Sequence, residues 1–194
     1  MKIYILRHEK RPEDCSFFVP LSEDGLKDAI KLVPHLKACN IDLIFSSPFI
    51  RTLQTIYPYV KSENKKINLE YGLCEIHHED IIPKMGARMV LPSYLAKSFQ
   101  VNENYETFIR NTDIIYPEKE KDCETRMIRV LRYIIEKYYK TKHNIVLVTH
   151  QGLCNAALKV VNKYIKINEE ELENYEKGKL TLIYNNGWSY KKIN

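Results

Sequence analysis

Two histidines and two arginines of this chain follow apolar segments of the kind that form buried strands. Arg7 and His8 follow the first such segment, Arg51 follows the second, and His150 follows a later one. A phosphate dianion needs fixed cations, and the planar guanidinium fork of arginine can bind two of its oxygens at once. At about 4 Å and an effective dielectric near 20, each charge pair is worth on the order of 4 kcal/mol before desolvation. A histidine that is neutral near pH 7 can attack phosphorus as a nucleophile. These residue types therefore indicate chemistry on a phosphoryl group.

Strands and helices must alternate along the chain to bring these four side chains together. Apolar, β-branched runs predict strands at residues 1–6, 41–45, 67–69 and 144–149, and a closing hairpin at 180–184 and 187–193. Helical spacing of apolar residues predicts helices at residues 22–38, about 120–140 and 151–161, the first of them capped by Ser22. A further helix is expected to open with Ser47 as its N-cap and Pro48 at its first position.

This order of elements predicts an α/β fold, a three-layer α/β/α sandwich with a mostly parallel central sheet. In such sheets, ligands bind outside the carboxyl ends of the strands, which is where the four polar residues are placed. We expect residues 1–194 to form a single domain. Residues 76–118 are irregular, with short helical patches predicted at 94–99 and 105–111. We expect this insertion to act as a lid that sets specificity.

Composition excludes several classes of protein. The chain has 194 residues, of which 44% are hydrophobic and 28% charged, and this excludes collagen-like and mainly disordered proteins. No apolar run approaches the roughly 18–20 residues that span a bilayer. The apolar start of the chain is too short for the core of a signal peptide, and Arg7 and His8 interrupt it. We therefore expect a soluble, cytoplasmic protein with no membrane partner.

The charge balance and the cysteines narrow the partners further. The net charge is +5, a mild excess that is spread along the chain, so it allows an anionic substrate without requiring nucleic acid. We expect no nucleic-acid partner. The five cysteines are widely spaced and form no C-x-x-C pair, so we expect reduced thiols rather than a disulfide framework or a zinc ribbon.

Five blocks of the sequence, in order and at compatible spacings, resemble the histidine phosphatase superfamily, which includes cofactor-dependent phosphoglycerate mutase and the histidine acid phosphatases. The family's Arg-His-Gly after a first strand is similar to Arg-His-Glu here, and its other blocks match as they stand. The blocks are Ile3 to Glu9, Leu21-Ser22-Glu23-Asp24-Gly25, Ser46-Ser47-Pro48-Phe49-Ile50-Arg51-Thr52-Leu53-Gln54-Thr55, Leu73-Cys74-Glu75, and Val148-Thr149-His150-Gln151-Gly152. Leu180-Thr181 suits the family's last strand. The resemblance implies a phosphoglycerate mutase-like fold.

The resemblance also implies a role for each residue of the site. His8 would be the nucleophile that becomes phosphohistidine, and Arg7 and Arg51 would clamp the phosphate oxygens. His150 would bind the phosphate and stabilise the charge of the transition state. Glu75 would donate a proton to the leaving oxygen and then accept one from water. No metal and no cofactor are implied.

The chain departs from the family pattern next to the nucleophile. Glu9 stands where the family usually has Gly or Ala, and we expect its carboxylate to point away from the phosphate or to pair with Lys10 or Arg11. The asparagine that many members carry after Arg-His-Gly is missing. The block Arg-His-Glu-Lys-Arg is instead similar to Arg-His-Gly-Glu-Arg in the branch of ubiquitin-associated, SH3-containing tyrosine phosphatases. Arg11 is therefore a candidate phosphate ligand.

Other chemistries are weaker interpretations of the sequence. His77 and His78, with Glu75 nearby, could suggest a metal site, but adjacent histidines point in different directions, so we expect none. His35 and His143 fit structural roles. Phe17 and Phe18 could line the rim of the site or pack in the core. Lys84, Arg88 and Lys97 of the insertion could reach a second acidic group, although a solvated role is favoured for each.

The sequence thus predicts a metal-independent phosphomonoester hydrolase that acts on a phosphorylated small molecule or a phosphoprotein. Two alternatives remain open. One is a phosphoglycerate mutase-like phosphotransferase, in which the phosphoryl group returns to a bound product. The other is a regulatory module that binds phosphate with little catalysis. A homodimer is a reasonable expectation.

Overall fold

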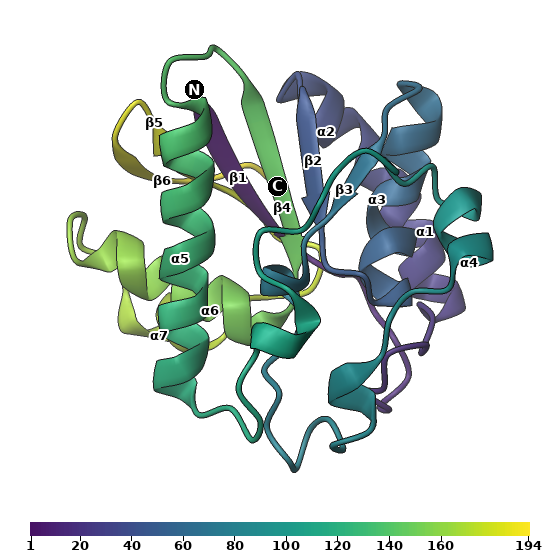
Figure 1. The fold of residues 1–194 in the computed structure, drawn as a ribbon. Helices are drawn as coiled ribbons and strands as arrows, with labels where there is room; N and C mark the ends of the chain where they lie inside the picture. Colours follow the sequence, from purple (N-terminus) through teal and green to yellow (C-terminus); the bar gives the residue numbers. More distant parts are fainter.

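A computed structural model describes residues 1–194 and contains one mixed sheet of six strands (Figure 1). The strands are β1 (Lys2–Arg7), β2 (Leu43–Ser46), β3 (Ile67–Leu69), β4 (Asn144–Thr149), β5 (Leu180–Asn185) and β6 (Trp188–Lys192). Their order in the sheet is β3-β2-β4-β1-β5-β6. The four strands from β3 to β1 are parallel, whereas β5 is antiparallel to both of its neighbours. The predicted α/β class with a mostly parallel sheet is confirmed.

Helices cover both faces of this sheet (Figure 1). One layer contains α1 (Glu23–Lys31), α2 (Val33–Ala38) and α3 (Ile50–Ser62), and the other contains α5 (Glu120–Tyr138) and α6 (Gln151–Asn162). Two short helices, α4 (Ser93–Ser98) and α7 (Glu169–Glu173), lie outside these layers. None of the helices is both long enough and apolar enough to cross a bilayer.

The register of the central strands brings distant parts of the chain together. β4 lies between β1 and β2, and its residues from Ile145 to Thr149 are buried, which explains its continuous apolar run. Arg7 at the end of β1 is paired with Thr149 at the end of β4. The next residues along these two strands, His8 and His150, therefore emerge side by side at the carboxyl edge of the sheet.

The predicted helix at 22–38 is two helices. Ser22 caps the first as predicted, because its side chain accepts a hydrogen bond from the Gly25 amide. The helix ends at Lys31, and α2 begins at Val33 with a proline in its first turn. Pro34 has no N–H group to continue the hydrogen-bonded ladder of α1, so the chain restarts its helix there.

The helix after β2 starts two residues later than predicted. Phe49 has an extended backbone and occupies the N-cap position of α3, and no side chain caps this helix. The Ile50 amide, an N-terminal donor of the helix, bonds the Phe17 carbonyl instead. The prediction of Ser47 as N-cap is therefore wrong. Its hydroxyl instead lies 2.9 Å from Nε2 of His150.

The insertion from 76 to 118 is largely irregular, and its predicted second helical patch at 105–111 is wrong. The reason is a buried carboxylate outside the segment. Glu70, only 1% exposed, accepts hydrogen bonds from the amides of Phe108 and Ile109 and from the hydroxyls of Tyr105 and Thr107. These amides are thereby unavailable to a helix. The patch at 94–99 is confirmed as α4, and α7 was not predicted.

We expect Glu70→Ala to lower the free energy of unfolding by about 3 kcal/mol, because it leaves several buried donors without a partner. Urea denaturation followed by circular dichroism measures the loss. The matched control is Glu106→Ala, which removes an exposed carboxylate from the stretch 105–111 that Glu70 holds. This control should change stability by less than about 0.5 kcal/mol. Equal effects of the two substitutions would contradict the anchoring role of Glu70.

Candidate active site

His8 lies at the carboxyl end of β1 with only 1% of its surface exposed. Its Nδ1 lies 2.7 Å from the Glu9 carbonyl oxygen, which can only accept, so Nδ1 carries the proton. Nε2 of the neutral ring is therefore left with its lone pair. Burial, and then the charge of Arg51, hold the pKa of His8 well below its usual value. The ring is thus neutral, and the lone pair of Nε2 is free.

His150 faces His8 from the end of β4, with ring centroids 5.2 Å apart in an edge-to-face arrangement. The His150 ring is fully buried, and burial together with Arg51 and His8 holds its pKa well below the usual value. Its Nδ1 lies 3.8 Å from Oε2 of Glu75 and has no hydrogen-bond partner. The structure thus brings the two predicted histidines and the predicted acid together.

Arg51 projects from the first turn of α3 into the same place and is fully buried. One terminal nitrogen donates to the Ser16 carbonyl at 2.8 Å, and the guanidinium lies 4.5 Å from the centre of the Phe49 ring. Its Nε and its other terminal nitrogen contact no acceptor of the protein. Burial lowers the pKa of Arg51 to about 10, so the group still carries its charge at neutral pH.

Arg7 and Arg11 bring further positive charge to the His8 imidazole. Both contribute to the lowered pKa of His8 through their charge. Arg7 is anchored through the carbonyl of Tyr175, whose own hydroxyl is buried against Thr181. Arg11 donates through Nη1 to the carbonyls of residues 12–14, so this part of its fork is occupied by its own loop.

The position of Glu75 is fixed mainly by hydrogen bonds to the backbone of the segment that carries it. The carboxylate, with 9% of the residue exposed, accepts one hydrogen bond from the Ile76 amide. Behind it, the buried Arg126 of α5 donates to the carbonyls of Gly72 and Cys74 and forms an ion pair with Glu118. This network fixes the segment that carries Glu75 against α5.

The Glu9 side chain lies on the other side of the backbone from the His8 ring and forms an ion pair with neither Lys10 nor Arg11. Its carboxylate is 5% exposed and lies against Gly178, on which a Cβ atom would be 2.0 Å from Oε1. Gly178 has a positive φ of 68°, a conformation suited to glycine. Burial raises the pKa of Glu9 to about 7.

The remaining predicted residues lie outside this cluster. Burial lowers the pKa of His77 to about 3, and its amide bonds Glu118. Phe17 is buried, whereas Phe18 is 39% exposed. Arg88 binds two backbone carbonyls of the insertion, which is a structural role. All five cysteines are free thiols, as predicted. No group of three or more His, Cys, Asp or Glu side chains has an arrangement that suits a metal ion.

Sequence reasoning missed several groups that build the site. Ser47 was interpreted as a helix cap, although it contacts His150. The Ser16 carbonyl and Tyr175 anchor the two arginines through backbone groups, which no side-chain pattern reveals. Arg126 stands among many charged residues of α5, and only its place on the apolar face beside Met127 and Val130 could have signalled its burial.

The fold and the site define a class of protein: an α/β sandwich that presents two neutral imidazoles and a buried guanidinium at the carboxyl edge of its sheet. A family model, "Histidine phosphatase superfamily (branch 1)", matches residues 16–193. The chain therefore belongs to the histidine phosphatase superfamily. The matched range begins after His8, so the assignment of Arg7 and His8 to the site rests on the motif and on the geometry.

Solved structures with the same fold cover nearly the whole chain. The ecdysone phosphate phosphatase of Bombix mori is 14% identical with a TM-score of 0.70, covering 98% of this chain and 91% of its own. YhfR of Bacillus stearothermophilus is 20% identical with a TM-score of 0.68, covering 98% and 94%. A mycobacterial glucosyl-3-phosphoglycerate phosphatase with inorganic phosphate is 16% identical with a TM-score of 0.66, also covering 98% and 94%.

One curated relative is similar over part of the chain. The 2,3-bisphosphoglycerate-dependent phosphoglycerate mutase of Methanococcus vannielii is 34% identical over 92 residues. The aligned part is 45% of this chain and 37% of the mutase, so the match spans well under half of that relative.

The state of the His8 ring can be tested directly by nitrogen NMR of the imidazoles. Because burial and Arg51 depress the pKa of His8, we expect its ring to remain neutral, with the proton on Nδ1, as the pH falls through about 6.5. A His8 ring that protonates near that pH, or that carries its proton on Nε2, would contradict the geometry. In Arg51→Met, which removes the nearby charge, the pKa of His8 should rise.

Proposed function

We propose that this chain is a phosphomonoester hydrolase that acts through a phosphohistidine intermediate on His8. The observation that carries the proposal is the hydrogen bond from Nδ1 of His8 to the Glu9 carbonyl. This bond places the lone pair on Nε2 of a neutral, buried ring beside Arg51 and His150. A nucleophile held in one tautomer among unpaired cationic donors suits attack on a phosphate dianion.

The first step transfers the phosphoryl group to the enzyme. Nε2 of His8 attacks phosphorus, and the bond from phosphorus to the leaving-group oxygen breaks. The protonated carboxyl of Glu75 gives its proton to that oxygen. In the second step a water molecule attacks the phosphohistidine and gives a proton to the Glu75 carboxylate, and the N–P bond breaks. Inorganic phosphate leaves, and His8 and Glu75 return to their starting states.

The cations of the site stabilise the charge on the transferring group. Arg51 offers two unpartnered N–H-bearing nitrogens in a buried position, where a charge-assisted hydrogen bond is stronger than in water. Arg7 and Arg11 add positive charge beside it. Nδ1 of His150, which has no partner in the protein and lies beside Glu75, supplies a further donor to the phosphate. None of these steps uses a metal ion or a cofactor.

The solved neighbours of this fold act on phosphate esters of different kinds. The solved neighbours include an ecdysone phosphate phosphatase and a glucosyl-3-phosphoglycerate phosphatase. We therefore propose a phosphorylated small molecule or a phosphoprotein as substrate, with residues 76–118 as the lid that selects it. We retain a cytoplasmic location and a homodimer as predictions.

A mutase is the second candidate, favoured by the 34% identity to a phosphoglycerate mutase over 45% of the chain. The same phosphohistidine would then pass its phosphoryl group to a bound product rather than to water. Interconversion of 2- and 3-phosphoglycerate that depends on a bisphosphate primer, with little release of phosphate, would establish this alternative in place of hydrolysis.

Hydrolysis of an aryl phosphate in the presence of EDTA tests the hydrolase directly. We expect turnover by the wild type and a loss of at least about a thousandfold in His8→Ala, because covalent catalysis is then impossible. The control is His143→Ala, which changes a half-exposed histidine in a turn and should leave turnover unchanged. Equal activity of wild type and His8→Ala would exclude His8 as the nucleophile. Loss of wild-type activity with EDTA would exclude the metal-free mechanism.

A further inference from the structure

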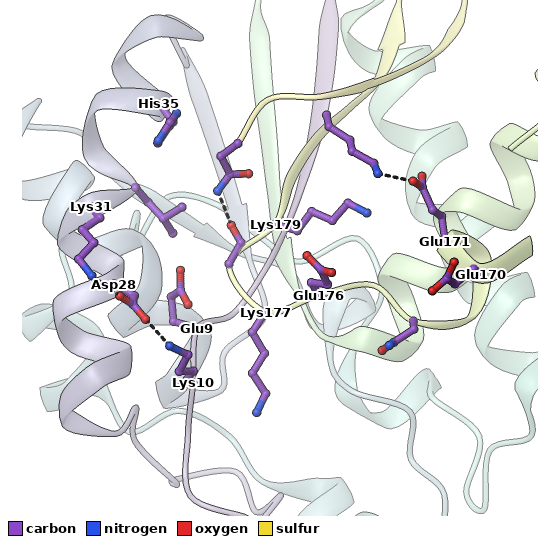
Figure 2. A pocket seen from close by; sticks show the side chains of 15 residues that line it. Glu9, Lys10, Asp28, Lys31, His35, Glu170, Glu171, Glu176, Lys177 and Lys179 are labelled. Atoms are coloured by element: carbon purple, nitrogen blue, oxygen red, sulfur yellow. Dashed lines mark hydrogen bonds and ion pairs between the residues drawn. The ribbon is translucent and has the colours of Figure 1, made fainter. Parts of the chain in front are cut away.

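The side chain of Glu9, the residue after His8, lies in a highly charged cavity. This cavity has a volume of about 510 Å³, and Leu32 is its single hydrophobic lining residue. Figure 2 shows Glu9 between α1, which carries Asp28 and Lys31, and the segment 176–179 that leads into β5. His8 does not line this cavity, so residues 8 and 9 face opposite sides of one backbone.

Glu9 forms no ion pair, because Lys10 and Lys31, the two lysines whose charge acts on it, bind Asp28 instead. Lys10 and Lys31 both bind Asp28, at 2.9 Å and 2.8 Å, and these two bonds lower the pKa of Asp28 to about 2 (Figure 2). The Glu9 carboxylate is only 5% exposed and forms no ion pair, and the backbone amide of Lys10 is the group that bonds it. The negative charge of Asp28 acts with burial to raise the pKa of Glu9, and Lys10 and Lys31 only partly oppose this.

Other charged groups line the cavity without pairing to Glu9. From α2 there is His35, and from the segment before β5 there are Glu176, Lys177 and Lys179. Lys179 lies 5.1 Å from the centre of the Tyr175 ring rather than against a carboxylate. At the far end, Lys192 of β6 pairs with Glu171, and Glu170 lies beside them. Apart from Glu9, four acidic side chains and five lysines line the cavity, and none of these lysines forms an ion pair with Glu9.

The backbone around Glu9 is also the backbone that holds the nucleophile. The Glu9 carbonyl accepts the His8 Nδ1 proton, and the Glu9 amide donates to Thr55 on the turn of α3 that follows Arg51. Gly178, against which the carboxyl group packs, donates its amide to the carbonyls of Arg7 and His8. A change of charge on Glu9 thus occurs within one residue of the attacking ring.

We propose that the charge on the Glu9 carboxyl group sets how tightly the His8 site holds a phosphate dianion. The inference rests on the proposed function of the His8 site. When Glu9 is protonated, the site's positive charge acts unopposed on the dianion. When Glu9 is ionised, a buried carboxylate with no ion-pair partner lies one residue from His8 and repels the dianion. Affinity for the substrate dianion then falls as the pH rises through about 7, whereas the attacking ring stays neutral throughout.

The test compares tungstate binding and aryl phosphate turnover by wild type and Glu9→Gln from about pH 6 to about pH 8.5. Tungstate is a tetrahedral dianion across this range, and the ratio of the two proteins at each pH cancels any titration of the substrate. We expect equal dissociation constants at the acid end and binding about threefold to tenfold weaker in the wild type at the alkaline end. The change should appear in the dissociation constant and in KM, with kcat nearly unchanged. A general structural defect would instead lower kcat at every pH.

Two further variants sharpen the result. Asp28→Asn removes the neighbouring negative charge and releases the two lysines, and both changes lower the pKa of Glu9. The loss of affinity should therefore occur at lower pH than in the wild type. Glu176→Gln removes an exposed carboxylate of the same cavity and should leave the wild-type profile unchanged. A ratio of wild type to Glu9→Gln that is constant with pH, or a profile that Asp28→Asn does not shift, would overturn the proposal.

The outcome separates this proposal from the proposed function. If wild type binds tungstate with the expected pH dependence but hydrolyses no phosphate ester, the hydrolase fails and the role of Glu9 stands. If wild type hydrolyses the ester through His8 with a constant ratio, the hydrolase stands and the role of Glu9 fails.

Thermal unfolding gives an independent measurement that needs no ligand. The pKa of Glu9 is raised from 4.5 unfolded to about 7 folded, so the folded state loses stability as the pH rises between these values. Glu9→Gln should therefore unfold at a higher temperature than the wild type above about pH 7, with the difference vanishing toward pH 4.5. No difference at alkaline pH would show that the carboxyl group ionises freely and would overturn the proposal.

Discussion

The structure depends on one costly arrangement, the burial of the Arg51 guanidinium beside two imidazoles without a carboxylate bound to it. A buried charge without a partner is expensive, and here Phe49 and one backbone carbonyl are the contacts that hold it. The same charge keeps His8 and His150 neutral, because a second cation in this place would be repelled. Binding of an anion relieves this arrangement, so the cost in stability and the affinity for phosphate have one origin.

The parallel sheet makes this arrangement possible. β1, β4 and β2 end at the same edge, and the next residues of the chain carry His8, His150 and the turn that leads to Arg51. These three strands are buried and hydrogen-bonded on both sides, so the side chains at their ends have little freedom to move apart. The stability of the core thus holds the cations and imidazoles together against their mutual repulsion.

The sequence predicted the parts of this molecule in which one pattern decides the structure. β4 was predicted with its observed bounds because a continuous apolar run admits few alternatives, and the site residues followed from their positions after such runs. The prediction failed where a distant group decides. The split at Pro34 is local and could have been anticipated, but the late start of α3 depends on the Phe17 carbonyl, and the loss of helix at 105–111 depends on Glu70. Spacing along the chain carries no information about such partners.

Glu9 shows why a departure from a family pattern can be tolerated beside a nucleophile. The group that orients His8 is the Glu9 carbonyl, which every residue type possesses, so the side chain at this position is not needed for the tautomer. The alternation of side chains along extended backbone then directs that side chain to the opposite side from His8. What limits it is Gly178, whose missing Cβ leaves the space that the carboxyl group fills. The substitution therefore preserves the geometry of attack and changes only the charge behind it, and this confines its effect to the electrostatics of the site.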